Sequence, residues 1–250
     1  LSLAVAVSTA LASPVMAQQG DTPEIEEIQV ISTSRRPENL SDVNASVAIL
    51  SEEALRLVNH THIQEAANRL PGVNINRNNG QESLASIRSP VLSGGGACGA
   101  FLMAEQGIPL RAAGFCNVNE LFDSHSENAE RIEVIRGPGS AFYGSNAVHG
   151  MINVVLPRAG TGNDVSLEFG PRGTLRGNAR IGFGDEFKQT LLINGITEEG
   201  YRADSGYDQQ KATWLYETTL DNGVNLDGGI GITNLNQETA GYVVGTDAYK

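Results

Sequence analysis

The pattern of apolar and polar positions changes near Pro157. Beyond it, apolar and polar residues alternate one by one, which is typical of strands with one apolar and one polar face. The alternation recurs in four segments: residues 165–169, 175–183, 212–218 and 224–230. At most about five strands of ordinary length fit before Lys250. The sequence therefore predicts an antiparallel sheet over residues 158–250.

Before Pro157 the pattern is that of a small α+β domain, with short strands and short helices. Ser51 followed by two glutamates provides an N-cap and favourable first-turn charges for a helix that ends at Val58. Thr61 is expected to cap a second helix, whose apolar residues share one face: Ile63, Ala66, Ala67 and Leu70. Strands are expected at residues 46–50, 73–76, 101–108, 132–136 and 151–156, with a helical turn at 118–122. Gly107 predicts a hairpin-like bend within the third of these strands.

A Gly-rich segment links the last two strands of this domain. Its four glycines are Gly137, Gly139, Gly144 and Gly150. Glycine adopts positive φ angles without strain and lets two backbones approach closely. The spacing therefore predicts a tight crossover between the strands.

The crossover and its flanking strands, residues 130–156, resemble the end of the plug domain of TonB-dependent outer-membrane receptors. Three upstream motifs follow the family's order: a segment at 28–33 similar to the TonB box, Leu-Pro-Gly-Val at 70–73, and Ser-Ile-Arg at 86–88. The resemblance covers roughly residues 24–157. It departs from the family at His149, where these plugs commonly carry a small residue, so local packing is expected to differ there. An unrelated α+β domain is the alternative interpretation.

The resemblance implies a fold and a domain organisation. Residues 40–157 would form an α+β plug domain, a small mixed sheet with short helices, and residues 158–250 the first antiparallel strands of a transmembrane β-barrel. The family's barrel has about 22 strands, so the chain is expected to be a fragment that lacks most of it. Tight turns at 184–187 and 221–223 and a long polar loop at 197–210 agree with the short periplasmic turns and longer outer loops of such barrels. A soluble β-sandwich would show the same alternation.

Residues 1–17 have the composition of a signal peptide. They are apolar and end in the small-residue cleavage signal Val15-Met16-Ala17, so export with cleavage after Ala17 is expected. An uncleaved membrane anchor is the alternative, but the run is shorter than the ~20 residues that a spanning helix needs, and Pro14 interrupts it. Together with the resemblance, this indicates a location in the cell outer membrane.

Residues 18–39 are expected to form a mobile N-terminal segment that carries the TonB box. The resemblance implies that the energy-transducing protein TonB binds this box, which comprises Ile28, Gln29, Val30, Ile31, Ser32 and Thr33. Its β-branched composition suits strand addition to a partner's sheet edge through main-chain hydrogen bonds. Pro37 and the polar residues 32–39 separate it from the plug. The alternative is that residues 28–31 are simply the first strand of the plug.

Cys98 and Cys116 are the only cysteines. An even pair in an exported protein indicates a disulfide, which would stabilise the fold by ~3 kcal/mol on the chain-entropy estimate. The four histidines have no metal-ligand spacing with them, so no metal site is expected. A nucleophilic Cys98 would need a paired base, and the sequence identifies none.

Charge and motif content argue against several function classes. Asp and Glu number 29 against 17 Lys and Arg, a balance that argues against a nucleic-acid-binding surface. The chain has neither a Gly-x-Ser-x-Gly elbow nor a His-Glu-x-x-His helix, so an enzyme is not expected. No cofactor is expected either.

The function that the resemblance implies is uptake of a scarce solute: a ferric siderophore, a vitamin or a glycan fragment. The solute would bind on the outer face, and TonB would pull on the box and rearrange the plug without breaking a bond in the solute. Such a plug must be held by polar contacts, because a purely apolar interface would resist mechanical release. The implied partners are TonB, outer-membrane lipid and the small solute. A non-energised outer-membrane porin or an adhesin with a plug-like domain is the alternative.

Two sets of plug residues are expected to carry this function. Arg88 and Arg136 match the family's plug arginines that face barrel carboxylates, a pairing that suits the guanidinium fork, and their partners would lie beyond residue 250. A solvated or locally paired charge is the alternative for each arginine. Solute contacts are expected from plug loops that point outward: Ser93, Gly94, Gly95, Gly96, Arg111 and Phe115. These loops equally suit a purely structural role.

Overall fold

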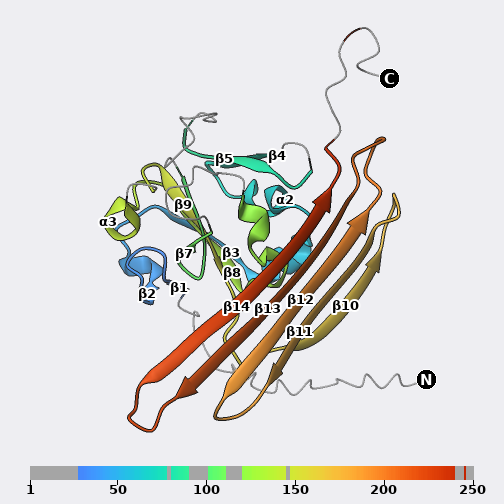
Figure 1. Cartoon of the computed structure of the whole chain (residues 1–250). Coiled ribbons are helices and arrows are strands. Elements are labelled where there is room, and N and C mark those ends of the chain that lie inside the picture. Colours follow the sequence, from blue (N-terminus) through green and yellow to red (C-terminus); the bar gives the residue numbers. More distant parts are fainter. Residues whose placement is uncertain are drawn as a thin grey trace, which may run out of the picture.

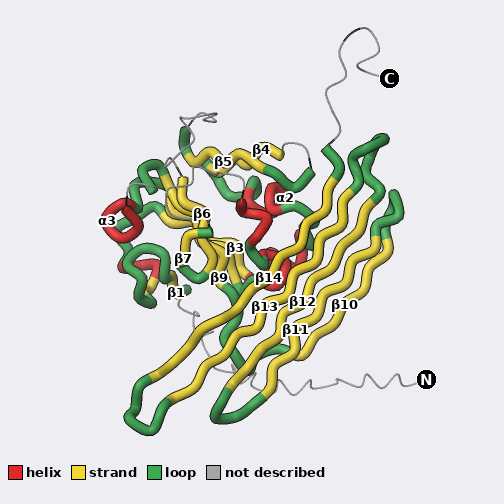
Figure 2. The backbone as a smooth tube through the Cα atoms, viewed as in Figure 1, coloured by secondary structure: helices red, strands yellow, loops and turns green. Residues whose placement is uncertain are grey.

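The computed structural model describes residues 28–77, 80–89, 101–110, 120–144, 147–239 and 245. The chain forms an N-terminal domain of short strands and helices, followed by a C-terminal sheet of long strands (Figure 1). The N-terminal domain packs against one face of this sheet (Figure 2). Among the described residues, no helix is long and apolar enough to cross a membrane.

The N-terminal domain is built on a mixed sheet. Its strands, in spatial order, are β3 Val47–Ser51, β8 Arg131–Ile135, β9 Gly150–Val155, β6 Phe101–Glu105 and β7 Ile108–Pro109. β8 pairs antiparallel with β3 and β9, whereas β9 and β6 run parallel. The predicted bend is confirmed at Gly107, whose φ of 74° turns the chain from β6 into β7.

Two short helices follow β3. α1 spans Glu52–Val58 and begins after Ser51, whose hydroxyl accepts a hydrogen bond from the third amide of the helix at 3.3 Å, which confirms the predicted cap. α2 spans Ile63–Ala67, and its N-cap is His62 rather than the predicted Thr61. The imidazole Nδ1 of His62 accepts from the second amide of α2 at 3.0 Å. Thr61 lies one position too early, so its hydroxyl bonds a glutamate side chain of the helix instead.

The main hydrophobic core lies between one face of the mixed sheet, the two helices and a β-hairpin. The hairpin consists of β4 Val73–Arg77 and β5 Ser83–Ile87. The most deeply buried large side chains of this core include Ile75, Ile87, Leu121, Ile132 and Ile152. The opposite face carries a smaller cluster around Leu102, Ile135 and Met151, beside α3 Ser140–Tyr143.

Two glycines of the crossover are required by the backbone. Gly144 has a φ of 76°. At Gly150 a Cβ would lie 2.7 Å from the carbonyl oxygen of Ile135, so only glycine fits between β9 and β8. Gly137, in contrast, has no neighbour within 4 Å of such a Cβ. The close backbone approach predicted from the glycine spacing therefore occurs at Gly150.

Gly150→Ala is expected to lower the free energy of unfolding of the N-terminal domain by about 1–3 kcal/mol, because the added methyl overpacks β9 against β8. Gly137→Ala is the matched control and is expected to stay within about 0.5 kcal/mol of the wild type. Calorimetric unfolding midpoints measure the difference. Equal midpoints for the two variants would contradict the close approach.

The C-terminal sheet is antiparallel and runs in chain order. Its strands are β10 Asn163–Phe169, β11 Leu175–Phe183, β12 Lys188–Glu198, β13 Tyr207–Thr219 and β14 Asn225–Gln237. The predicted alternation and the tight turn at 184–187 are confirmed. The loop predicted at 197–210 is shorter, because β12 and β13 continue pairing until Glu198 meets Tyr207.

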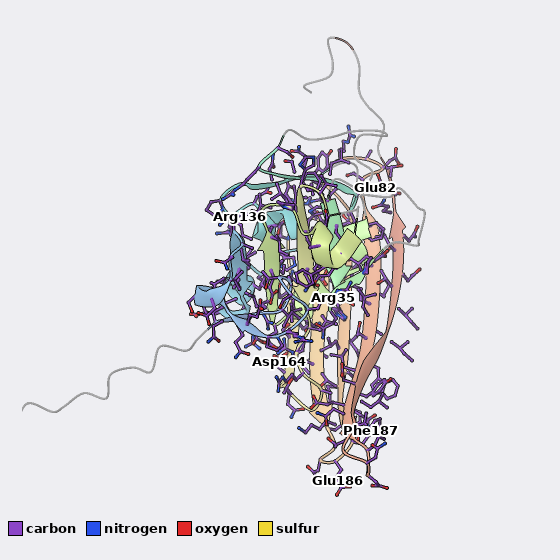
Figure 3. All side chains as sticks on the ribbon, turned by 90° about the vertical axis from the view of Figure 1, so that its left-hand side faces the viewer. Arg35, Glu82, Arg136, Asp164, Glu186 and Phe187 are labelled. Atoms are coloured by element: carbon purple, nitrogen blue, oxygen red, sulfur yellow. The ribbon has the colours of Figure 1, made fainter. Side chains whose placement is uncertain are left out.

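The two faces of the C-terminal sheet differ in chemistry. The face turned away from the N-terminal domain exposes apolar side chains: Val165, Leu167, Ile181, Ile230 and Ile232. Three aromatic rings cluster near the 184–187 turn, where Phe187, Trp214 and Tyr216 have centroid separations of 5.2 to 6.4 Å. Figure 3 shows Phe187 at one end of the strands and Glu82 of the N-terminal domain at the other. An apolar outer band with aromatic rings at its edge is typical of outer-membrane barrels.

Candidate functional site

The N-terminal domain meets the C-terminal sheet through charged side chains. Arg176 and Arg180 of β11 and Lys211 of β13 lie between the two units and are 4%, 7% and 4% exposed. Burial of a charge is costly unless the charge is paired and hydrogen-bonded. The partners of these three residues therefore decide how firmly the two units are joined. We call these three residues and their partners in the N-terminal domain the seat.

Arg176 binds the end of α1. Its guanidinium donates to the carbonyl oxygens of Asn59 and His60 at 3.1 and 2.8 Å. It also pairs with Glu168 of β10, and the Glu168 carboxylate accepts a hydrogen bond from the Asn59 side chain at 2.6 Å. Asn59 ends α1 with a φ of 50°, a left-handed conformation that asparagine tolerates well. The C-terminus of α1 is thereby held to two neighbouring strands.

Arg180 binds the start of α1. Its guanidinium donates to the Glu52 carboxylate at 2.8 Å and to the Asn128 carbonyl oxygen at 3.0 Å. Arg56, one helical turn after Glu52, lies 3.1 Å from the same carboxylate and 2.8 Å from that of Asp164 on β10. The Arg56 side chain is 63% exposed, so solvent screens its pairs and they contribute about 0–1 kcal/mol. Arg180 is the buried member of this network.

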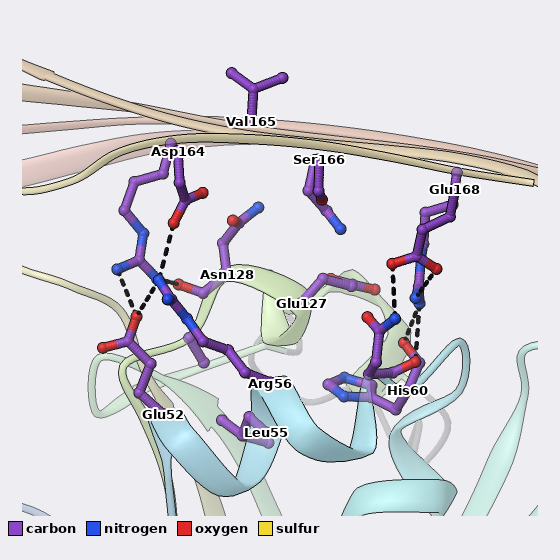
Figure 4. A pocket seen from close by; sticks show the side chains of 15 residues that line it. Glu52, Leu55, Arg56, His60, Glu127, Asn128, Asp164, Val165, Ser166 and Glu168 are labelled. Atoms are coloured by element: carbon purple, nitrogen blue, oxygen red, sulfur yellow. Dashed lines mark hydrogen bonds and ion pairs between the residues drawn. The ribbon is translucent and has the colours of Figure 1, made fainter.

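A cavity of about 320 Å³ lies between α1 and strands β10 and β11 (Figure 4). Arg176 and Arg180 both line it, whereas Figure 4 shows Val165 pointing away from it. Within the described part of the chain, the buried Nε atoms of both arginines have no protein partner. A cavity this polar and this large is expected to hold water, which satisfies such donors. The seat is therefore expected to be hydrated beside α1.

Lys211 forms a deeply buried ion pair of the seat. Its Nζ lies 2.9 and 3.1 Å from the two carboxylate oxygens of Glu127 and donates to the Ser124 carbonyl oxygen at 2.6 Å. Burial alone would raise the pKa of Glu127, but Lys211 and two nearby histidines outweigh it and lower that pKa to about 2. The carboxylate is therefore ionised at neutral pH. Glu127 belongs to a segment with two short helices, η3 Glu120–Asp123 and η4 Ser126–Asn128. The ion pair holds this segment against β13.

Three buried histidines lie in or near the seat. The His125 ring nitrogen Nδ1 lies 3.0 Å from the Thr213 hydroxyl of β13, so His125 joins the interface directly. Burial lowers the pKa of His125 and that of His62 to about 4, and it also lowers the pKa of His60. All three imidazoles are therefore neutral at pH 7, and protonation would destabilise the packed state.

His62→Asn is expected to reduce the loss of stability on acidification. The pKa of His62 is lowered from 6.5 to about 4 by burial, so the unfolded chain takes up this proton first. Stability is complete above pH 6.5 and is lost as the pH falls toward 4, by about 3 kcal/mol for this group. Asparagine keeps an acceptor for the α2 cap but does not titrate.

Calorimetric unfolding at a series of pH values between about 7 and 4.5 tests this effect. His149→Asn, at an exposed position, is the matched control. The same pH slope in the wild type and in His62→Asn would contradict the role of the buried imidazole.

Residues 28–39 fold back onto the N-terminal domain. They form two short paired strands, β1 Gln29–Val30 and β2 Glu38–Asn39. The amides of Ile31 and Ser32 donate to the buried carboxylate of Glu133 at 3.1 and 2.9 Å. The structure thus places residues 28–39 against the N-terminal domain, and the mobility predicted for this segment stays a prediction. Its polar composition does not reveal the acceptor that Glu133 provides for its main chain.

Comparison with known families identifies the N-terminal domain. The profile of the TonB-dependent receptor plug domain family matches residues 39–151, from β2 to the start of β9. The chain carries a TonB-dependent receptor plug domain. The resemblance that rests on the Gly-rich crossover and on the motifs at 70–73 and 86–88 is thus confirmed, whereas the TonB box at 28–33 precedes the matched residues and stays a prediction. The N-terminal domain is called the plug below, and the C-terminal sheet is called the wall.

Solved structures of similar fold include two receptors and a transporter. The pyoverdine outer-membrane receptor of Pseudomonas aeruginosa PAO1 is 14% identical, with a TM-score of 0.67 over 83% of this chain and 30% of its own. The alcaligin outer-membrane receptor of Bordetella pertussis is 13% identical, with a TM-score of 0.65 over 83% of this chain and 35% of its own. A copper transporter is 14% identical, with a TM-score of 0.62 over 78% of this chain and 31% of its own.

This chain thus spans about a third of the length of these proteins. The similarity confirms the predicted fold class: a plug with a mixed sheet and few helices, followed by antiparallel strands that correspond to the beginning of the barrel.

The structure brings Arg88 and Arg136 together within the plug. Arg88 donates to the Arg136 carbonyl oxygen at 3.3 Å and to the Ser46 hydroxyl at 3.0 Å. Arg136 donates to the Pro71 carbonyl oxygen at 2.9 Å. The ion pairs between described residues include neither arginine. Their pairing with barrel carboxylates beyond residue 250 stays a prediction.

The other predicted site residues lie outside the described residues: Ser93, Gly94, Gly95, Gly96, Arg111, Phe115, Cys98 and Cys116. The solute contacts and the disulfide therefore stay predictions. His149 is exposed, and its ring centroid lies 5.9 Å from that of Phe101. The position that departs from the family is thus a surface position, where a larger side chain is accommodated.

Sequence analysis missed most of the seat. The alternation over residues 175–183 puts Arg176 and Arg180 on the polar face of the strand, and arginines buried on that face require partners in the plug. That requirement was a usable signal. The plug partners Glu52 and Glu127 carry no comparable signal, since acidic residues near the start of a helix are common. Glu133 stands in the middle of an apolar strand, and a carboxylate at such a position signals a buried polar contact.

Proposed function

We propose that the whole protein is a TonB-dependent outer-membrane receptor that takes up a scarce solute by energised rearrangement of its plug. The observation that carries the proposal is the plug domain held on the polar face of the wall through Arg176, Arg180 and Lys211. No bond in the solute is broken. The task of the protein is to switch the plug between a closed and an open arrangement.

An ionic, hydrated seat suits such a switch. The Lys211–Glu127 pair fixes the position of the plug, because moving one partner alone leaves a buried charge uncompensated. Hydrogen bonds of the seat can be exchanged for bonds to water, whereas apolar contacts cannot. The cavity of about 320 Å³ beside Arg176 and Arg180 brings water to the interface. The plug is therefore held firmly at rest while its release stays accessible to an applied force.

The outer face of the wall supports a location in the outer membrane. Val165, Leu167 and Ile230 expose 76%, 62% and 59% of their surface on this face. Alternating strands whose outer side chains are apolar match the lipid-facing surface of a barrel. We propose that residues 1–17 direct export and are removed, and that lipid covers this face in the complete protein.

Residues 28–33 are proposed as the segment that TonB binds. Strand addition needs an extended segment with free main-chain donors and acceptors. This segment already contains a strand, β1, which ends in Val30. In the structure it is folded against the plug, so TonB binding requires its release.

The solute is proposed to be a ferric siderophore or another metal complex. A vitamin or a glycan fragment is the alternative. The similar structures are outer-membrane receptors for pyoverdine and alcaligin and a copper transporter. The proposed contacts are Ser93, Gly94, Gly95, Gly96, Arg111 and Phe115.

Binding of purified full-length receptor to the periplasmic domain of TonB tests the energised function. Deletion of residues 28–33 is expected to weaken binding by at least about tenfold, because the main-chain donors for strand addition are removed. Deletion of six residues upstream, 20–25, is the matched control and should leave binding unchanged. Equal binding by the wild type and the 28–33 deletion would refute the TonB coupling and favour a porin or adhesin.

A further inference from the structure

Two polar side chains occupy the middle of the central strands of the plug. Glu133 of β8 and Asn153 of β9 lie directly opposite each other in the strand pairing, and neither has exposed surface. A buried carboxylate is unfavourable unless strong hydrogen bonds compensate it. One of its partners is Arg131, whose Nε lies 2.7 Å from Oε1 of Glu133. The others belong to the N-terminal segment.

Glu133 binds the main chain of the segment at two consecutive residues. Its Oε2 accepts from the amides of Ile31 at 3.1 Å and of Ser32 at 2.9 Å. Asn153 supports the same place, since its side-chain amide donates to the Ser32 hydroxyl at 3.0 Å. Hydrogen bonds to an ionised acceptor are about twice as strong as neutral ones. The carboxylate is therefore a strong attachment point for residues 31 and 32.

The segment is also attached through the side chain of Val30, which is fully buried, and through several weaker contacts. β1 pairs with β2 at only two positions, and the Leu40 amide donates to the Ile28 carbonyl oxygen at 2.9 Å. The Arg35 guanidinium lies 4.8 Å from the centroid of the Tyr143 ring. Ile28 is 53% exposed, so the segment is loosely covered at its beginning. Among the described contacts, Glu133 is the charged residue of the mixed sheet that holds residues 28–33, whereas Glu38, which accepts from the Thr33 hydroxyl, belongs to the segment itself.

We propose that Glu133 controls TonB binding by competing with TonB for the main-chain amides of Ile31 and Ser32. The inference rests on the proposed function of residues 28–33. Strand addition requires free main-chain donors. In the folded-back arrangement Glu133 accepts from two of these donors, and the main chain of β1 is paired with β2. Only receptors whose segment has left Glu133 can bind TonB. Glu133 is thus a positioning residue that sets the fraction of receptors competent for coupling.

Release of the segment does not leave the carboxylate without a partner. Arg131, two residues away on the same strand, lies 2.7 Å from Glu133 and also pairs with Glu130 at 2.7 Å, so this ion pair does not depend on the segment. The charge of the Glu133 carboxylate is therefore balanced by Arg131 whether the segment is bound or released. A two-state element of this kind can be shifted by a modest difference in binding, as a switch requires.

Glu133→Gln is the sharpest variant because it keeps the size of the side chain and removes its charge. Its amide group would also face the two donors of the segment. Glu133→Asp keeps the charge but shortens the reach, which provides a second variant. Glu130→Gln is the matched control, since Glu130 pairs with the same Arg131 and the described contacts place no bond between it and residues 28–33.

Amide hydrogen exchange of peptides covering residues 28–39 measures the release in full-length receptor without solute. Glu133→Gln and Glu133→Asp are expected to raise the exchange of this segment by about tenfold or more, since each removes hydrogen bonds to a charged acceptor. The affinity for the periplasmic domain of TonB should rise by the same factor, because the competent fraction multiplies the affinity. Glu130→Gln should change neither. Protection of peptides from β3 and β6 verifies that the variants are folded.

Each result decides the proposal. Faster exchange together with tighter TonB binding in the Glu133 variants supports it. Unchanged exchange would overturn it, as would faster exchange without tighter binding while the wild type does bind TonB. If neither the wild type nor the variants bind TonB, the proposed function fails, and with it the competition. The exchange data would then still report whether Glu133 holds the segment, so the two failures are distinguishable.

Discussion

Lys211→Met is expected to weaken the seating of the plug by about 3–5 kcal/mol, because it removes one partner of a buried ion pair and leaves the other. The two side chains are only 3% and 9% exposed. Without Lys211, burial dominates and the pKa of Glu127 rises from about 2. The loss should therefore shrink on acidification, when protonation removes the stranded charge. A merely steric effect of methionine would not depend on pH.

Calorimetric unfolding of the full-length receptor measures this loss, and two further variants serve as controls. The double variant Glu127→Gln with Lys211→Met removes both charges and should recover most of the stability. Lys188→Met, at an exposed position of β12, should stay within about 0.5 kcal/mol of the wild type. If Lys211→Met is no less stable than Lys188→Met, the buried pair does not hold the plug.

The local part of the fold could be predicted from the sequence. The alternation around residues 165–169 and 175–183 fixed both the strands and the face that each presents, because side chains of a strand alternate between its two faces. The cap at Ser51 and the turn at Gly107 follow from the conformations that these residue types favour. At α2 the preference for threonine as N-cap did not hold, because the helix starts one residue later than expected and His62, not Thr61, supplies the acceptor.

The contacts that join distant segments could not be predicted. Lys211 and Glu127 are 84 residues apart in the chain, and Glu133 and Ser32 are 101 apart. No periodicity or propensity encodes such pairs, which exist only once two elements have packed. The same holds for Arg88 and Arg136, whose described partners lie in the plug itself. The pairing of Arg88 and Arg136 with barrel carboxylates beyond residue 250 stays a prediction.

Deletion of residues 28–33 is expected to abolish uptake while leaving solute binding unchanged. These residues are the proposed point at which TonB applies force, and they contact the plug chiefly through Glu133 and β2. Without them the seat formed by Arg176, Arg180 and Lys211 is intact, so the plug stays in place. A closed plug admits no solute. The proposed solute contacts, residues 93–96, 111 and 115, lie outside this segment, so solute binding is expected to be unchanged.

Cells that express the full-length gene can be supplied with a panel of radiolabelled ferric siderophores. For a solute that the wild type binds and accumulates, we expect the 28–33 deletion to bind it with the same affinity and to accumulate none. Accumulation by the deletion at the wild-type rate would contradict the central claim that force on this segment opens a plug held by polar contacts.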